Sequence, residues 1–521
     1  MNKIITFLFV ILTLNVSFIN CQYGTPTFKI DNAPSLQLIK QYNQSQIYSL
    51  SSSGYQKPII IANLTGNHYE MGFAAGYLMA QEAYDNYNVM VGAVLPKTWE
   101  KDAFEAFLDW QWNDYLSKQI TQNYLDEIQG YSDGAQASGF TQLGRTIERG
   151  VVISSFPGDP TENIEYLLRD ELLDGMDLFS NYLVKNDRFD VLEKIKEIVF
   201  NNEDDQSTRS SKGLQCSHFS TWGDRTVGGD MFNGRNLDWL NGSGISNNKL
   251  ITFYHPIGQY SHAAIGFAGL IGAIVGISSK GIFVAESDND SVKVTFDGFA
   301  WSMRLRYIME NAANIEEAVS LWDSTNNTMG MCHSLASATE ASTAEHPAFA
   351  LETMKGYTAF FSDNDPNEHY IFTDPKTGEK TQMGYPLENA VYRTNHGFDE
   401  TIRKNEWEPA VPNGDSWIRY MLFYNTFSYY TSSNISISEL QAINITSILG
   451  NKHSIQDIYS SPAPFYDCTN AWMGYNIISS TFHFASNKMF VAFEEGFGQQ
   501  RICAACGTYV EIDLSPWFGP F

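Results

Sequence analysis

The residues Gln215-Cys216 and the downstream run Gly-Arg-Asn-Leu-Asp-Trp (Gly234 to Trp239) decide the fold that this sequence predicts. Hydrolysis of the peptide bond before Cys216 would leave one residue with both a thiol and a free α-amine. These groups are the nucleophile and the base that cleavage of an amide or ester requires. An α-amine has a pKa of about 8 and can accept the thiol proton near neutral pH. We therefore interpret Cys216 as a nucleophile hidden inside a precursor, with Gln215-Cys216 as the bond that is cut.

A polar segment, Asn201 to Gly213, precedes this cysteine and has no apolar periodicity, which predicts an exposed linker. At 521 residues with 43% hydrophobic content, the chain can bury a large core. We divide it into a signal peptide (1–21), a helical N-terminal segment that ends in the linker (22–215) and a catalytic part (216–521).

The first residues have the pattern of a secretory signal peptide. Met1-Asn2-Lys3 carries one positive charge, Ile4 to Phe18 is mostly apolar, and a small residue, Cys21, offers a cleavage position. The apolar core is too short for a comfortable membrane span, so a retained anchor is the lesser alternative. We expect the mature protein to be secreted or lysosomal, without stable membrane insertion.

In the N-terminal segment, apolar residues recur every four positions and predict one face of an amphipathic helix. We interpret them as packing residues and not as a ligand site. Asp159-Pro160 is typical of a helix start, and more helix is expected toward Phe200. The recurring residues are Phe104, Leu108, Trp112, Leu116, Ile120 and Tyr124.

After Cys216, short apolar runs separated by turn residues predict a substantial β-sheet. Residues 301–311 and 315–322 have the pattern of helices, so the fold class is α+β. The apolar run Gly266 to Ile277 is too short for a membrane span and rich in glycine, and it predicts a pair of buried strands. Other predicted strands are 250–254, 281–285, 348–352, 370–373 and 489–493.

Removal of the signal leaves five cysteines in a compartment that favours disulfides. If Cys332, Cys468, Cys503 and Cys506 form two disulfides, in any of the three connectivities, Cys216 keeps a free thiol. Cys503-Ala-Ala-Cys506 could instead be a redox or metal pair, although no second Cys-x-x-Cys or nearby histidine cluster completes a zinc site. Cys216 could also be a buried or disulfide-bonded cysteine.

Composition limits the partners of the chain. A formal net charge of −26 argues against nucleic acid, which requires basic patches. No metal-binding or nucleotide-binding motif occurs, so we expect no cofactor. Export would expose Asn-x-Ser/Thr sequons to glycosylation, although chance explains many in a chain rich in these residues. The sequons that follow the signal lie at Asn43, Asn63, Asn241, Asn289, Asn326, Asn434 and Asn444.

The proposed chemistry needs groups that hold the amine and groups that stabilise a tetrahedral oxyanion. Asp238, Arg235 and Asn395 fit these needs by residue type. Cys216 followed by Gly234 to Trp239 resembles the N-terminal nucleophile hydrolases of the choloylglycine hydrolase, acid ceramidase and penicillin acyltransferase group, in which an Arg-x-x-Asp element follows the cysteine. Here the interval between the two is a few residues longer than in the choloylglycine hydrolase pattern, which indicates a longer first hairpin.

Two further elements resemble the acyl-coenzyme A:aminopenicillanate acyltransferase branch. They are Leu64-Thr-Gly-Asn-His-Tyr-Glu-Met-Gly-Phe-Ala-Ala-Gly76 and Tyr392-Arg-Thr-Asn-His396, and by resemblance the second supplies Asn395 as an oxyanion donor. Asp415-Ser-Trp-Ile-Arg419 resembles the Ser-x-x-Arg element of that branch and places Ser416 and Arg419 near the site.

The resemblance implies a four-layer αββα sandwich, made as a zymogen and cut into two fragments that stay associated. It also implies a cofactor-free enzyme that hydrolyses carbon–nitrogen amide bonds of small lipophilic N-acyl substrates through a thioester on Cys216. Alternatives on the same site are a lipid-ester hydrolase of the phospholipase B-like kind and an acyltransferase. A secreted glycoprotein that keeps the fold without turnover is an alternative of another class.

Each candidate residue also has a simpler interpretation. Arg235 to Asp238 could form a turn closed by the aspartate, and Asn395 and Arg419 could serve only the backbone or a surface carboxylate. His218 would share the face of Cys216 in a strand, yet a lone histidine is more often structural. A papain-like protease, with its base among His333, His396 and His483, lacks the local signature around its cysteine.

Overall fold

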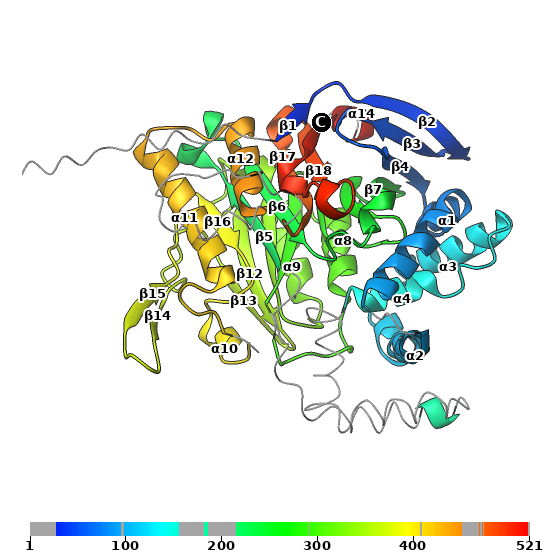
Figure 1. Ribbon diagram of the computed structural model, residues 1–521, viewed down its shortest axis with the longest axis horizontal. Coiled ribbons are helices and arrows are strands. Elements are labelled where there is room, and N and C mark those ends of the chain that lie inside the picture. Colours follow the sequence, from blue (N-terminus) through cyan, green and yellow to red (C-terminus); the bar gives the residue numbers. More distant parts are fainter. Residues whose placement is uncertain are drawn as a thin grey trace, which may run out of the picture.

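The computed structural model describes residues 28–94, 98–155, 182–185, 215–289, 291–406, 409–450, 468, 471 and 474–518. The signal peptide, the polar linker and the helix that we predict from Asp159 lie outside the described residues. The described chain contains large sheets and helices (Figure 1), and the predicted α+β class is confirmed.

The smaller of the two large sheets holds the candidate nucleophile, because Cys216 lies on its strand β5. Its order is β1 (Lys29–Asp31), β19 (Thr508–Asp513), β18 (Lys488–Phe493), β17 (Asn476–His483), β6 (Phe232–Asp238), β5 (Gln215–Thr221) and β16 (Ala390–Arg393). All pairs are antiparallel except β1 with β19.

The larger sheet faces it with ten strands. Their order is β13 (Tyr357–Phe361), β12 (Ala348–Met354), β11 (Met331–Ser337), β10 (Ile282–Asp288), β9 (Val275–Ser278), β8 (His262–Phe267), β7 (Lys249–Pro256), β4 (Ile59–Gly66), β3 (Ser45–Ser51) and β2 (Ser35–Tyr42). A separate hairpin joins β14 (Tyr370–Thr373) to β15 (Lys380–Met383). The predicted strands after residue 280 are therefore confirmed.

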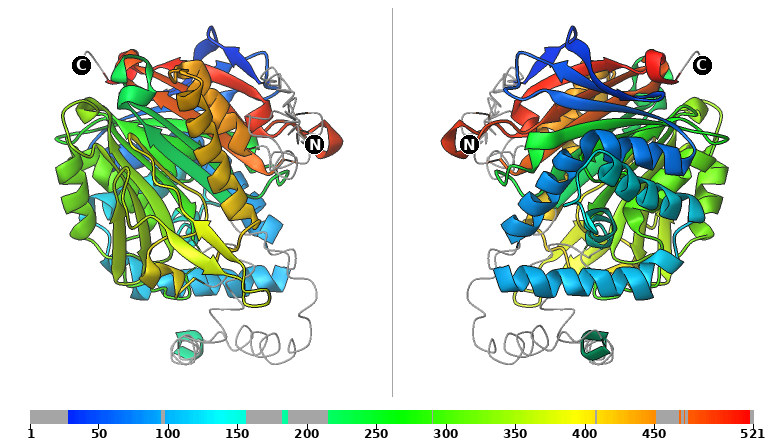
Figure 2. Two further views of the ribbon diagram at one scale, coloured as in Figure 1. Left: turned by 90° about the vertical axis from the view of Figure 1, so that its left-hand side faces the viewer. Right: turned by 90° about the vertical axis from the view of Figure 1, so that its right-hand side faces the viewer.

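Helices cover the outer face of each sheet and complete four layers. Helices α11 (Asp415–Ser432) and α12 (Glu439–Gly450) pack on the seven-stranded sheet, whereas α8 (Trp301–Asn311) and α9 (Ile315–Asp323) pack on the ten-stranded sheet. The left view of Figure 2 shows the lime-green and orange helices on opposite sides of the sheets. The predicted αββα arrangement is confirmed, and α10 (Glu400–Arg403) and α14 (Ser515–Phe518) are short additions.

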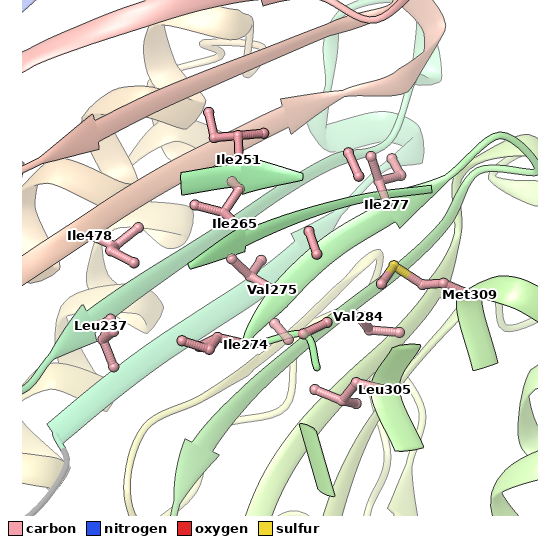
Figure 3. Packing of buried hydrophobic residues seen from close by; sticks show 14 of the residues in the cluster. Leu237, Ile251, Ile265, Ile274, Val275, Ile277, Val284, Leu305, Met309 and Ile478 are labelled. Atoms are coloured by element: carbon pink, nitrogen blue, oxygen red, sulfur yellow. The ribbon is translucent and has the colours of Figure 1, made fainter. Parts of the chain in front are cut away.

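One hydrophobic core extends through these layers (Figure 3). Leu237 and Ile478 come from the seven-stranded sheet, Val284 comes from the ten-stranded sheet, and Leu305 and Met309 come from α8. These side chains are almost wholly buried. Burial of such side chains stabilises a fold by about 1.5–3 kcal/mol each, so the core holds the two sheets in a fixed relation around Cys216.

The N-terminal segment begins with strands that the sequence pattern did not lead us to expect. Strands β1 to β4 precede its helices α1 (His68–Val94), α2 (Thr98–Asp114), α3 (Gln122–Ala137) and α4 (Thr146–Ile153). Strand β1 pairs with β19 in one sheet, and β4 pairs with β7 in the other. The segment therefore supplies strands to both sheets of the catalytic part.

The apolar stripe from Phe104 to Tyr124 is buried as predicted, but it does not form one helix. Helix α2 ends at Asp114, a 3-10 turn covers Leu116–Lys118, and α3 begins at Gln122. A repeat of four residues advances about 40° around a helix at each step. One straight helix could not keep these side chains on a single face, and the break returns them to the core.

Helices α1 and α3 approach each other closely through glycines on both sides. A Cβ atom added at Gly72 or Gly76 would overlap a backbone carbonyl oxygen of α3, and one added at Gly130 or Gly134 would overlap a carbonyl oxygen of α1. Two of these glycines belong to the N-terminal motif that ends at Gly76, so close helix packing explains them.

We expect Gly76→Ala to lower the free energy of unfolding by about 1–3 kcal/mol, because the new methyl group forces α1 and α3 apart. Gly92→Ala is the matched control, since no atom lies within 4 Å of the added Cβ on the same helix. That control is expected to raise stability by about 0.5–1 kcal/mol, because alanine favours a helix interior over glycine. Urea unfolding of both variants measures the difference, and equal stabilities would contradict the close-packing explanation.

The structure corrects the predicted disulfides. Cys468 and Cys506 form a disulfide, whereas Cys332 and Cys503 are buried free thiols. Cys216 is also free, as predicted, but the pairing of the other four does not follow the expected two-disulfide scheme.

Two of the sequons are buried in the folded chain. The side chain of Asn289 is 1% exposed and that of Asn444 is 9% exposed, so neither has room for a glycan. Asn63 is half-buried. The exposed residues Asn43, Asn241, Asn326 and Asn434 stay predicted acceptors. Among the described residues, no helix has the length and apolar character needed to cross a membrane.

Candidate active site

Cys216 is the second residue of β5, where it pairs with Leu237 of β6, and it is fully buried. A different side chain contacts each of its polar atoms. Its backbone N–H donates to Asn395 Oδ1 at 2.9 Å, its carbonyl oxygen accepts from Arg419 Nη1 at 2.6 Å, and its Sγ accepts from Arg235 Nη2 at 3.4 Å. Three residues predicted from distant parts of the sequence therefore meet at the candidate nucleophile.

The loop after β16 fixes the orientation of Asn395. Its backbone N–H donates to Ser416 Oγ at 2.8 Å, and its Nδ2 donates to the carbonyl oxygen of Asp288 at 2.8 Å. Both the Cys216 N–H and Arg419 Nη2 are donors, so they require the amide oxygen on their side. In this state Asn395 holds the nitrogen of Cys216, and its role as an oxyanion donor stays a prediction.

Arg419 enters the site from the first turns of α11. Asp415, the first residue of that helix, accepts from Arg419 Nε at 3.0 Å, and Nη2 donates to Asn395 Oδ1 at 2.7 Å. The guanidinium is fully buried. Its planar set of donors suits the simultaneous contact with Asn395 and with the Cys216 carbonyl.

Arg235 on β6 is paired with a carboxylate that the sequence analysis missed. Its Nη2 contacts Glu286 Oε1, and both side chains are buried. Burial raises the pKa of Glu286, whereas Arg235 lowers it. Glu286 lies on β10, so this ion pair links the two sheets directly beside the sulfur. The sequence signal for Glu286 was its position, because it is an acidic residue directly after the apolar run Ile282 to Ala285.

Asp238 lies at the end of β6, opposite Gln215 in the strand pair. Asn476 Nδ2 donates to Asp238 Oδ1 at 3.0 Å and to the carbonyl oxygen of Leu237 at 3.1 Å. All three residues are buried. Asn476 orients the aspartate, and no sequence motif marked it.

The thiol of Cys216 is protonated in this uncut chain at physiological pH. Burial raises the pKa of Cys216 far above its ordinary value, and the Glu286 carboxylate raises it further. Arg235 and the backbone N–H of Asp238 act in the opposite direction. A thiolate therefore requires a nearby base during reaction, and this need is what a free α-amine would meet.

The histidines considered as alternative bases have other partners. His396 Nδ1 is hydrogen-bonded to Ser416 Oγ at 2.7 Å, His333 packs on Trp322, and His483 is hydrogen-bonded to Glu439. Burial, with the charges of nearby arginines, lowers the pKa of His396 to about 3.

His218 faces the same side of the sheet as Cys216. Burial, with the positive charges of Arg393 and Arg235, lowers the pKa of His218 to about 3, so it cannot accept a proton near neutral pH. In the part of the chain that the structure describes, no cluster of three or more potential metal ligands occurs.

A largely apolar pocket adjoins the site. It measures about 860 Å³, including its open mouth, and Glu286 and Leu237 line it. Leu237 is the cross-strand partner of Cys216, so the pocket begins beside the nucleophile. Ala83, Tyr87 and Met90 of α1 and Ile153 of α4 form the other wall. The N-terminal segment and the catalytic part therefore build the pocket together.

The fold and the site define an αββα sandwich with a buried cysteine on a central strand. Residues 225–454 match the model of the acyl-coenzyme A:6-aminopenicillanic acid acyl-transferase family. The predicted resemblance to that family is confirmed for this region. The region includes Arg235, Asp238, Asn395 and Arg419, and it begins after Cys216.

Comparison with curated proteins finds no match. Among solved structures, the chain is similar to the N-acylethanolamine-hydrolyzing acid amidase ortholog of Caenorhabditis elegans, with 12% identity and a TM-score of 0.32 over 51% of this chain and 92% of that one. It is similar to a mutant of conjugated bile acid hydrolase from Clostridium perfringens, with 11% identity and a TM-score of 0.30 over 59% of this chain and 95% of that one. It is also similar to penicillin V acylase from Agrobacterium tumefaciens, with 11% identity and a TM-score of 0.24 over 53% of this chain and 83% of that one.

Proposed function

We propose that this chain is an autoprocessed cysteine amidohydrolase that cleaves the amide bond of small lipophilic N-acyl substrates through a thioester on Cys216. The observation that carries the proposal is the separate contact of Asn395, Arg419 and Arg235 with the nitrogen, carbonyl oxygen and sulfur of Cys216. Two of these contacts are to backbone atoms, which any buried residue must satisfy, but the third places a buried guanidinium on the sulfur, which a purely structural cysteine does not require.

Processing begins with attack of Cys216 Sγ on the carbonyl carbon of Gln215. The C–N bond breaks, and the thiol proton passes to the Cys216 nitrogen, which gives a thioester and a free α-amine. Water then hydrolyses the thioester, releases the carboxyl group of Gln215 and regenerates the thiol. Asn395 holds the nitrogen on which the new amine forms, since its Oδ1 already accepts the N–H.

In turnover the α-amine takes the thiol proton, and the sulfur attacks the carbonyl carbon of the substrate amide. The substrate amine leaves with that proton, and water hydrolyses the acyl thioester to the free acid. Arg235 stabilises negative charge on the sulfur because its guanidinium already contacts Sγ. Arg419 keeps Cys216 fixed through its carbonyl oxygen.

The pocket supports a lipophilic acyl group. Its wall beside Cys216 is apolar, and an acyl chain placed there would be removed from water at a gain of about 0.8 kcal/mol per buried CH₂. Glu286 is the charged residue of this lining, and Arg235 neutralises it. The signal sequence supports a secreted or lysosomal protein, in which the two fragments remain associated.

Incubation with a panel of N-acyl amides, a ceramide and a phospholipid tests the proposal through the acid released. We expect the amides to turn over. Turnover of the phospholipid alone would make the chain a lipid-ester hydrolase and would contradict the amidase proposal. Addition of a second amine measures acyl transfer through its acylated product. Absence of all turnover by a processed chain would favour a non-catalytic glycoprotein.

We expect Met90→Trp to shorten the pocket. The larger ring would lower kcat/KM for long-chain N-acyl amides by about tenfold or more, because each lost methylene contact is worth about 1–3 kcal/mol in specificity. Short-chain amides should lose much less. Ile257→Trp is the control, since that side chain is 71% exposed. An equal loss for long and short chains would show that this pocket does not hold the acyl group.

A further inference from the structure

A second group of buried charges lies outside the candidate active site, where α1, α3 and α8 meet. His68 begins α1, Glu127 lies on α3, and Arg306 and Glu310 lie on α8. Their side chains are at most 5% exposed. We call these four residues the charge cluster. It contains no residue of the proposed mechanism.

Arg306 is the centre of the charge cluster. Its Nη1 and Nη2 donate to the two oxygens of Glu127 at 2.7 and 2.8 Å, and its Nε donates to Glu310 Oε1 at 2.8 Å. Nη1 also donates to the carbonyl oxygen of Ile271 at 2.7 Å. The guanidinium therefore joins both carboxylates and also a loop that borders the pocket.

Both ring nitrogens of His68 face oxygen acceptors. Nδ1 lies 2.8 Å from Glu127 Oε2, and Nε2 lies 3.0 Å from Gln259 Oε1. A neutral imidazole has one donor and one acceptor nitrogen, so it can satisfy only one of these contacts. An imidazolium donates at both nitrogens and satisfies both.

The orientation of Gln259 is fixed by a chain of amides. Asn311 Nδ2 donates to the carbonyl oxygen of Tyr307, which turns Asn311 Oδ1 toward Gln259. Gln259 Nε2 donates to that oxygen at 3.1 Å, which leaves Gln259 Oε1 for His68. A flipped Gln259 would lose the bond with Asn311. The acceptor at His68 Nε2 is therefore built into the structure.

The charge cluster connects residues on the two sides of Gln215-Cys216. His68 and Glu127 precede that bond, whereas Gln259, Arg306 and Glu310 follow it. With His68 protonated, two positive charges balance two carboxylates. Loss of the proton leaves one buried negative charge without compensation, which is costly in a protein interior.

We propose that His68, as a buried imidazolium, joins the N-terminal segment to the catalytic part, and that this joint weakens when His68 loses its proton. The contacts exist in the uncut chain. Their action between separate fragments rests on the proposed cleavage. Since α1 and α4 form one wall of the pocket, the joint also keeps that wall in place.

Other groups around the charge cluster do not replace His68 as the titrating residue. Tyr124 of α3 donates to Glu310 Oε2 at 2.8 Å, and Tyr254 of β7 stacks under Arg306. Burial raises the pKa of both tyrosines above the physiological range. His262 of β8 lies 3.6 Å from Glu310 Oε1, and burial with the charge of Arg306 lowers its pKa, which keeps it neutral.

The direction of the pH effect follows from His68 itself. Burial lowers the pKa of His68, but the hydrogen bond and charge of Glu127 outweigh burial and place the pKa above its ordinary value of 6.5. The joint is therefore complete below pH 6.5 and is lost as pH rises through the pKa of the folded chain. Burial raises the pKa of Glu310, so a strongly acidic medium also changes the charge balance.

The test compares thermal unfolding from about pH 6 to about pH 9 in the uncut Cys216→Ala chain, with and without His68→Gln. We expect the midpoint of the parent to fall as pH rises above 6.5. The His68→Gln chain should start lower at the acidic end and lack this fall. His255→Gln is the control. Burial lowers the pKa of His255 on β7, so its loss should leave the fall above pH 6.5 in place. The same fall in His68→Gln would overturn the proposal.

Processed protein gives the second measurement, by size-exclusion chromatography at the two ends of that pH range. Between pH 6.5 and the pKa of His68 in the folded chain, the apparent dissociation constant of the N-terminal fragment should rise by up to about tenfold per pH unit, as expected for one linked proton, and it should level off at higher pH. Retention that does not change with pH would contradict the joint.

Two further measurements cover the cases in which the chain is not cut or the His68 variant does not fold. A wild-type chain that runs as one uncut band on a denaturing gel would contradict the proposed cleavage. The unfolding profiles of the uncut chain would still test the joint. If His68→Gln does not fold, the protonation state of His68 is measured directly. Nitrogen NMR spectra of histidine-labelled parent protein near neutral pH give that state. Two protonated nitrogens at His68 support the joint, and a neutral ring overturns it.

Discussion

Replacement of Cys216 with alanine is expected to leave the chain as one band on a denaturing gel and to reduce amide hydrolysis by at least about 10³-fold. Loss of a nucleophile removes the covalent route, and comparable deletions reduce kcat by several orders of magnitude. Because processing and turnover use the same sulfur, both should be lost in this single variant.

Two other buried free cysteines make a matched control for this substitution. Cys332→Ala and Cys503→Ala remove thiols that are equally buried but lie elsewhere, Cys332 on β11 and Cys503 just before the 3-10 turn Ala504–Cys506. Both variants should be cut and active. A Cys216→Ala chain that still yields two fragments would show that another protease makes the cut, and full activity in that variant would remove Cys216 from the mechanism.

Arg235→Met is expected to lower the free energy of unfolding by about 3–5 kcal/mol, because it leaves Glu286 buried without its partner. It should also reduce kcat by about 10²–10³-fold, the usual effect of losing one preorganised donor at a developing charge. Urea unfolding and steady-state kinetics measure these effects separately.

A double variant separates the structural role of this ion pair from its role in catalysis. Arg235→Met with Glu286→Leu removes both charges, and replacement of a buried ion pair by apolar residues is often neutral or stabilising. We expect stability to return and activity to stay low. If activity returns with stability, Arg235 serves only to neutralise Glu286.

The sequence predicted the catalytic part of the fold well where the pattern was periodic. The strand from Tyr370 to Thr373 and the helix from Trp301 to Asn311 occur at the predicted bounds. The prediction of two buried strands over Gly266 to Ile277 was only partly correct. Strand β8 ends at Phe267, β9 begins at Val275, and the residues between them border the pocket. Apolar side chains line a pocket as readily as they fill a strand, so composition could not separate the two.

The N-terminal strands were not predictable from local pattern. Residues 35–42 are mostly exposed and hold their place at the edge of the ten-stranded sheet by pairing with β3. This partner is the next strand along the chain, but an exposed edge strand lacks the alternation of a half-buried strand.

For the site, chemistry by residue type predicted Cys216, Arg235 and Asn395, and the family resemblance added Arg419. Cysteine parity reached a correct result by an incorrect route. The count assumed that the remaining thiols pair, whereas Cys332 and Cys503 are buried free thiols. Glu286 and Asn476 were missed because each acts through a neighbour, Arg235 or Asp238, and carries no motif of its own.

The pairing of β4 with β7 and of β1 with β19 has a consequence for how the molecule is made. A cut at Gln215-Cys216 would leave each sheet made of strands from two separate polypeptides, with the N-terminal strands paired at one end of the sheet. Folding of the intact chain is unimolecular, but recovery of the cut form after complete unfolding would require two chains to meet and would depend on their concentration. The processed protein would therefore stay folded only as long as its two fragments remain associated, whereas the precursor could refold on its own.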